Sequence, residues 1–214
     1  MNVINNYFSI QEYIKNIKLS NIKIISVSKT FKEEKILPLL NNGNIHFGEN
    51  KVQEAQNKWP FLKKRFPNVK LHMIGKLQSN KAKKAIEIFD YIHSLDNQKL
   101  ADVLSKEQNA TGKKIKYFIQ VNVGMESQKS GIQKELLSDF YSYCTNEKNL
   151  DVIGLMVIPP NDGNEEKYFK YICEANASLG LKEISMGMSS DYKVALKYKA
   201  TFLRIGSLIF GSRI

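Results

Sequence analysis

Apolar runs of strand length alternate with amphipathic stretches along the whole chain. Each run ends in Gly, Asn, Ser or Pro, and apolar residues recur at helical spacing in the stretch that follows. The pattern predicts strands at 22–28, 44–47, 69–74, 91–94, 115–123, 152–158, 183–186 and 201–205. It predicts helices at 7–17, 33–41, 50–66, 80–89, 98–110, 133–146, 165–179 and 191–198, with Pro60 kinking or splitting the third of them.

Eight strands that alternate with helices indicate a parallel sheet with crossover connections. Closed into a ring, they form a TIM (β/α)8 barrel, and 214 residues are near the lower limit for that fold. An open doubly wound sheet is the alternative, but no Gly-x-Gly-x-x-Gly follows the first strand. No linker or low-complexity tract interrupts the pattern, so we expect one α/β domain over residues 1–214.

The net charge of +11 raises the question of nucleic-acid binding. The basic residues are spread along the chain and are nearly all lysine, which is typical of solvated helix faces, so we expect no nucleic-acid partner. Charges interrupt every apolar run well before ~20 residues, so no membrane span is expected. Cys144 and Cys173 lack metal-ligand spacing, and the N-terminus lacks a basic signal-peptide region. We therefore expect a metal-free, cytoplasmic protein.

Polar and charged residues gather where the predicted strands end, which is the face that carries the active site of a TIM barrel. Lys29 follows the first strand and shares a face with Ile25 and Val27, so its amine is expected in the barrel mouth. Arg204 shares a face with Phe202 in the last strand. A lysine amine condenses with an aldehyde, and an arginine donates to a ring nitrogen.

The sequence also predicts an anion site beside these two cations. Gly206 and Ser207 are predicted to begin the final helix, where main-chain N–H groups and a hydroxyl can hold a phosphate, and Gly187 and Ser189 would complete the site. An aldehyde, a pyridine nitrogen and a phosphate together describe pyridoxal 5′-phosphate (PLP). An arginine leaves the pyridine nitrogen unprotonated, which argues against an aminotransferase.

Other polar residues permit more than one interpretation. Asn50 could hydrogen-bond the ring hydroxyl of PLP or cap a helix. The histidines lie in strands without a carboxylate partner, so each is expected to be packed or hydrogen-bonded; they are His46, His72 and His93. Lys129 could reach an anion at the mouth or be solvated. Met156, Met186 and Met188 are expected to line the pocket.

Several ordered blocks resemble the pyridoxal phosphate homeostasis protein family, also called proline synthase co-transcribed proteins. The resemblance spans nearly the whole chain and rests on Val27-Ser28-Lys29-Thr30, Phe47-Gly48-Glu49-Asn50, Ile74-Gly75-Lys76-Leu77-Gln78-Ser79-Asn80-Lys81, His93-Ser94-Leu95-Asp96, Lys129-Ser130-Gly131-Ile132, Gly154-Leu155-Met156, Ser185-Met186-Gly187-Met188-Ser189 and Arg204-Ile205-Gly206-Ser207. The chain departs from the family pattern at Lys76, where many members have histidine, and at Ser190, where many have aspartate.

The resemblance implies a barrel similar to the alanine racemase N-terminal domain. It implies that Lys29 carries the internal aldimine, that Arg204 faces the pyridine nitrogen, and that Ser189, Gly206 and Ser207 hold the phosphate. The implied function is a monomeric carrier and buffer of PLP that could supply PLP-dependent apo-enzymes and is not an enzyme.

Two other functions remain open at this stage. A PLP-dependent amino-acid racemase needs a second acid/base group opposite Lys29. No tyrosine is clearly placed for that role, and Tyr192, near the seventh strand, is the candidate left open. A basic RNA-binding module would bind in a strongly salt-dependent way and independently of Lys29.

Overall fold

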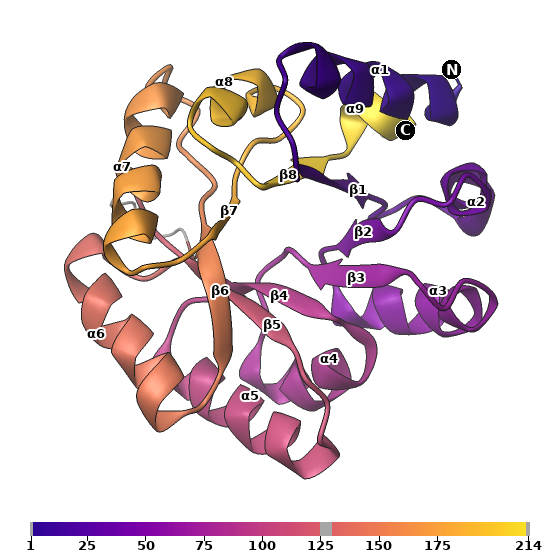
Figure 1. Cartoon of the computed structure of the whole chain (residues 1–214). Helices are drawn as coiled ribbons and strands as arrows, with labels where there is room; N and C mark the ends of the chain where they lie inside the picture. The colour runs from indigo at the N-terminus through magenta and orange to yellow at the C-terminus, as the bar shows by residue number, and fades with distance from the viewer. Residues whose placement is uncertain (1, 125–129, 213–214) are drawn as a thin grey trace.

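The computed structural model describes residues 2–124 and 130–212. Within these ranges, eight parallel strands form a closed barrel in chain order, and β8 pairs with β1 (Figure 1). The strands are β1 (Lys23–Val27), β2 (His46–Glu49), β3 (Lys70–Met73), β4 (Tyr91–Leu95), β5 (Lys116–Gln120), β6 (Asp151–Met156), β7 (Glu183–Ser185) and β8 (Phe202–Ile205). The predicted TIM barrel is confirmed.

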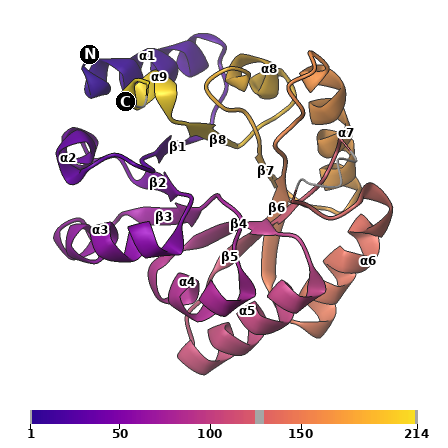
Figure 2. The ribbon, with the colours of Figure 1, turned by 180° about the vertical axis from the view of Figure 1, so that it is seen from behind.

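Helices surround the barrel on its outside in both views (Figures 1 and 2). They are α1 (Val3–Asn16), α2 (Glu33–Asn41), α3 (Val52–Arg65), α4 (Ala82–Ile88), α5 (Gln98–Thr111), α6 (Leu137–Ser142), α7 (Glu165–Ser178), α8 (Tyr192–Lys197) and α9 (Ser207–Phe210). Both terminal helices, α1 and α9, pack together, so the two ends of the chain lie side by side (Figure 2). None of the described helices is long and apolar enough to cross a membrane.

The alternation of side chains along each strand builds two separate cores. Outward-facing residues pack beneath the helices, and Phe47 and Trp59 are fully buried there. Inward-facing residues form a second, smaller cluster inside the barrel: Ile25, Val27, Ile74, Phe118, Met156 and Phe202. Because Ile25, Val27 and Phe202 face inward, the next residues on the same faces, Lys29 and Arg204, are directed to the barrel mouth.

Several details differ from the sequence-based expectation, among them α1, which begins at Val3 and not at residue 7. Strand β2 continues through Gly48 to Glu49, whose carboxylate is fully buried by contacts from α3. Pro60 does not split α3, which is continuous from Val52 to Arg65, and the proline lies at an exposed position of the helix. The helix expected at 133–146 is a 3₁₀ turn, α6 and a π-helical turn at Tyr143–Glu147.

Candidate functional site

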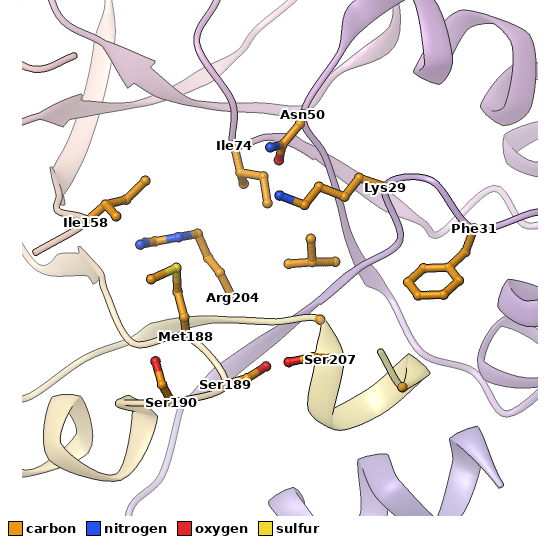
Figure 3. Close-up of a pocket in the computed structure, with 13 residues that line it drawn as sticks. Lys29, Phe31, Asn50, Ile74, Ile158, Met188, Ser189, Ser190, Arg204 and Ser207 are labelled. Carbon is orange, nitrogen blue, oxygen red and sulfur yellow. The ribbon is translucent and has the colours of Figure 1, made fainter. Parts of the chain in front are cut away.

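A cavity of about 510 Å³ opens at the carboxyl ends of the strands, at the mouth of the barrel. This volume is within the range of small-molecule sites. The lining residues are Val27, Lys29, Phe31, Asn50, Ile74, Ile158, Met188, Ser189, Ser190, Arg204, Gly206, Ser207 and Gly211. The structure therefore brings all six residues expected from the sequence (Lys29, Asn50, Ser189, Arg204, Gly206 and Ser207) to one cavity (Figure 3).

Lys29 lies two residues beyond Val27, the last residue of β1. Its side chain is half-buried, and its amine points into the cavity between Asn50 and Arg204 (Figure 3). The predicted orientation is thus confirmed. A lysine directed into a concave, partly apolar cavity is placed to act as a nucleophile toward a bound carbonyl compound.

The backbone on both sides of Lys29 is held by α3. The ammonium of Lys58 donates to the main-chain oxygen of Ser28 over 3.0 Å, and the main-chain N–H of Thr30 donates to Oε1 of Glu54. Thr30 has a positive φ of 70°, so the chain turns sharply directly after Lys29. Lys58 and Glu54 are themselves paired at 2.9 Å, and together they position the Lys29 turn.

Glu49 is the centre of this buried network. Its Oε1 accepts from Ser28 Oγ at 2.8 Å and from Lys58 Nζ and Trp59 Nε1 at 3.0 Å each. Burial raises the pKa of the Glu49 carboxyl, and the charge of Lys58 opposes that shift. Sequence reasoning missed Glu49, Glu54 and Lys58, because their contacts depend on the packing of α3 against β1 and β2.

Arg204 is buried in β8, with 4% of its surface exposed, and its guanidinium points into the cavity (Figure 3). Nη1 donates to Ser185 Oγ at 2.6 Å, and Nη2 donates to the main-chain oxygen of Val157 at 2.7 Å. Burial lowers the pKa of Arg204 to about 10, and Asp191 opposes this shift, so the group stays charged near neutrality. Its remaining N–H groups are therefore available to an acceptor in the cavity.

Two serine hydroxyls lie at the edge of the cavity nearest the C-terminus. Ser207 is the first residue of α9, as predicted, and its hydroxyl and that of Ser189 point toward each other (Figure 3). Ser189 Oγ accepts from the main-chain N–H of Leu208 at 3.3 Å, which holds the two segments together. Gly206 lines the cavity. Gly187 does not; it has a positive φ of 87° and accepts from the N–H of Arg204.

The other expectations have mixed outcomes. Asn50 lines the cavity, and the helix-cap interpretation is wrong because Lys51 is the N-cap residue of α3. The buried ring of Tyr192 packs edge-to-face on Tyr13, 5.8 Å between centroids, and is not part of the lining. Lys129 lies outside the described residues. Within 2–124 and 130–212, no group of His, Cys, Asp and Glu could hold a metal ion.

The methionines and histidines also have definite places. Met188 lines the cavity, whereas Met156 belongs to the inner core and Met186 to the outer one, so only Met188 fits the pocket-lining expectation. The histidines are hydrogen-bonded inside the barrel, as expected for His46, His72 and His93. Their contacts with one another could not be foreseen without the strand register.

The charge of the lining favours an anionic ligand. Lys29 and Arg204 are the ionisable side chains among the described residues that line the cavity, and no carboxylate stands with them. A buried cation that faces a cavity is stabilised when a ligand supplies an acceptor or a negative charge. The site thus combines an amine nucleophile, a fixed guanidinium and a pair of hydroxyls, and suits a phosphorylated aldehyde that has a hydrogen-bond acceptor in its ring.

Comparison with known proteins gives one consistent family. The alanine racemase N-terminal domain model matches residues 3–214. The pyridoxal phosphate homeostasis protein of Aquifex aeolicus is 38% identical, with 89% of this chain and 87% of that protein covered. The protein of the same name from Haemophilus influenzae is 34% identical, with 100% and 97% covered.

Solved structures agree with this result. PipY of Synechococcus elongatus PCC7942, solved with PLP bound, is 32% identical with a TM-score of 0.88, and the match covers 98% of this chain and all of PipY. An alanine racemase of Clostridium difficile 630 shares 16% identity with a TM-score of 0.76, and the match covers all of this chain and 58% of that enzyme. The second similarity is one of fold alone.

Proposed function

Because this chain belongs to the family of pyridoxal phosphate homeostasis proteins, we propose that it binds PLP in the cavity at the barrel mouth and carries and buffers it. One observation carries the proposal: Lys29 and Arg204 point into a single cavity that the hydroxyls of Ser189 and Ser207 border. We propose residues 1–214 as one PLP-binding domain.

The residues present fit this cofactor group by group. PLP supplies a reactive aldehyde, a pyridine nitrogen and a phosphate. The Lys29 amine would attack the aldehyde carbon, and one water would leave. Arg204 would donate a hydrogen bond to the pyridine nitrogen. Because a guanidinium can only donate, the nitrogen would accept with its lone pair and stay unprotonated.

The phosphate and the ring hydroxyl have partners in the same cavity. Ser189 and Ser207 would donate their hydroxyl protons to phosphate oxygens, and Gly206, which precedes Ser207 in the chain, lines the same cavity. Asn50 would hydrogen-bond the ring hydroxyl. Mostly neutral donors hold a doubly charged phosphate reversibly, which suits a protein that must release its cargo.

A carrier function also agrees with what the lining lacks. Within the described residues that line the cavity, Lys29 is the one side chain with the chemistry of a general acid or base. A racemase needs a second such group on the opposite face of the ring, and Tyr192 packs away from the cavity. We therefore propose a non-enzymatic, monomeric, cytoplasmic carrier that transfers PLP to apo-enzymes or to small amines.

The visible absorption spectrum of the purified protein with PLP tests this function. The native chain should show the band of lysine-bound cofactor, borohydride should abolish it, and Lys29→Ala should lack it. Lys35→Ala, which removes an exposed lysine of α2, should keep it. A native protein without the band, even with excess PLP, would contradict the proposal.

Racemisation assays separate the carrier from the enzyme. Native protein loaded with PLP should not convert one enantiomer of an amino acid into the other. Turnover that disappears in Lys29→Ala would support the racemase instead. Binding of RNA that weakens steeply with salt and persists in Lys29→Ala would support the nucleic-acid alternative.

A further inference from the structure

The chain has three histidines, and all of them lie in one hydrogen-bonded column inside the barrel. Nδ1 of His46 lies 2.9 Å from Nε2 of His72, and Nδ1 of His72 lies 2.9 Å from Nε2 of His93. Nδ1 of His93 lies 2.8 Å from Ser185 Oγ, the atom that accepts from Arg204. The column thus runs through the barrel to the guanidinium that faces the cavity.

Strand register explains why the three rings meet. His46 of β2 is level with Lys70 of β3, so His72 is two residues nearer the mouth. His72 is in turn level with Tyr91 of β4, so His93 is again two residues nearer the mouth. An offset of two residues keeps each side chain on the inner face of its strand. Because neighbouring strands are staggered in a barrel, each successive ring lies nearer the mouth.

Burial favours the neutral form of all three rings near physiological pH. Burial lowers the pKa of His46 to about 4, and the charges of Lys23 and Lys70 act in the same direction. Burial also lowers the pKa of both His72 and His93 well below the usual range. Each neutral ring has one N–H donor and one acceptor nitrogen, so every hydrogen bond along the column must point the same way.

Arg204 determines that direction. A guanidinium only donates, so Ser185 Oγ accepts from it. The hydroxyl proton of Ser185 then needs an acceptor of its own, and Nδ1 of His93 is the one in hydrogen-bond contact. His93 therefore carries its proton on Nε2 and donates to His72, and His72 donates from Nε2 to His46. The reverse order would direct two donors at Ser185 Oγ and leave its own proton buried without a partner.

We propose that the histidine column holds the Ser185 hydroxyl as an acceptor for Arg204 and so positions the guanidinium for the ring nitrogen of PLP. His93 and Ser185 are positioning residues, and His72 and His46 hold His93 in the required tautomer. The proposal rests on the proposed function for its cofactor readout. It makes a separate claim about the protein alone, namely that all three histidines carry their proton on Nε2.

NMR of protein labelled with 15N-histidine tests that claim without PLP, and the three rings make assignment simple. All three should be neutral Nε2–H tautomers at pH 7. Ser185→Ala removes the donor to His93 and should allow the Nδ1–H tautomer to appear. Ser94→Ala removes another buried hydroxyl, one without a hydrogen-bond partner, and should leave the three rings unchanged. An Nδ1–H tautomer or an imidazolium in the native protein would overturn the proposed direction.

PLP titrations test the positioning of Arg204. His93→Phe keeps a flat ring stacked on Phe118 but offers no acceptor to Ser185, so PLP affinity should fall roughly tenfold. The absorption band of the bound cofactor should also move, since the hydrogen bond to its ring nitrogen changes. His93→Asn restores an acceptor oxygen and should recover most of both effects. Circular dichroism and thermal unfolding establish that each variant is folded.

The outcomes separate this proposal from the proposed function. A native protein that does not bind PLP contradicts the proposed function. In that case the histidine tautomers seen by NMR still test the direction of the hydrogen bonds in the column. A native protein that binds PLP, with a folded His93→Phe of unchanged affinity and unchanged band, overturns the positioning role. If His93→Phe does not fold, Ser185→Ala replaces it in the titration, where the same loss of affinity and shift of the band are expected.

Discussion

The ammonium of Lys58 lies 3.0 Å from Oε1 of Glu49, and this ion pair is buried beneath the turn that carries Lys29. The same ammonium reaches the main-chain oxygen of Ser28. The position of Lys29 in the cavity therefore depends on α3, a helix that does not itself line the cavity.

Removal of Lys58 should be strongly destabilising. Lys58→Met leaves the Glu49 carboxylate buried without its cation, and the free energy of unfolding should fall by about 3–5 kcal/mol in urea denaturation. Lys64→Met, which removes an exposed lysine of the same helix, should cost less than about 1 kcal/mol. Equal effects of the two substitutions would show that the buried pair is unimportant. Combining Lys58→Met with Glu49→Gln should recover part of the loss.

Arg204→Met should weaken PLP binding more than any other change at the cavity except loss of Lys29. The variant loses a charged donor to the ring nitrogen, so the dissociation constant should rise by roughly ten- to a hundredfold. Arg204→Lys should not restore it, because one ammonium cannot replace the planar fork that contacts Ser185, Val157 and the ligand. Ser190→Ala, an exposed serine of the lining, provides the control. An unaltered affinity in Arg204→Met would remove Arg204 from the site.

The two serines can be tested with a pair of ligands. Ser189→Ala and Ser207→Ala should each lower the affinity for PLP by roughly three- to tenfold, because each removes one hydrogen bond to the phosphate. Pyridoxal has the same ring and aldehyde but no phosphate, so its binding should not change. Competitive titration of each variant with both ligands gives the ratio of the dissociation constants for PLP and pyridoxal directly. A parallel loss for both ligands would place the phosphate elsewhere.

Acid should destabilise the fold through the histidines. The pKa of His46 is lowered to about 4 and those of His72 and His93 are also well below normal, whereas in the unfolded chain each is about 6.5. Below pH 6.5 the unfolded state therefore binds more protons than the folded state, and stability falls with pH by up to ~1.4 kcal/mol per unit for each ring.

Urea midpoints measured between pH 7.5 and pH 5 test this slope. His46→Gln should make the decline shallower, because that variant lacks one of the three groups that take up a proton on unfolding. Burial raises the pKa of both Glu49 and Asp191, so these carboxyls act in the opposite sense at lower pH. A stability that stays constant between pH 7 and pH 5 would contradict the neutral column.

Much of the site was visible in the sequence because it depends on local alternation. Lys29 and Arg204 follow apolar residues at a spacing of two, and that spacing alone places them on the inner face of the barrel. Ser207 could be located because a glycine and a serine follow the last strand. These inferences needed only the neighbouring residues and the expectation of a closed parallel barrel.

Features that depend on contacts between distant elements were missed. Gly48 and Glu49 look like the start of a loop, and only the approach of Lys58 and Trp59 makes a buried glutamate possible. The histidines could be assigned to strands, but their meeting depends on a two-residue offset in the register of β2, β3 and β4. Single-sequence patterns contain neither kind of information.

The pairing of β1 with β8 has a consequence for how binding and folding are linked. Lys29 follows the first strand and Arg204 lies in the last, so neither half of the chain can present both groups before the ring of strands is complete. A ligand held between them ties the beginning of the sequence to its end. The free energy of ligand binding then adds to the stability of the closed barrel. The amount of folded protein would therefore rise with the supply of the vitamin-derived molecule that the protein carries.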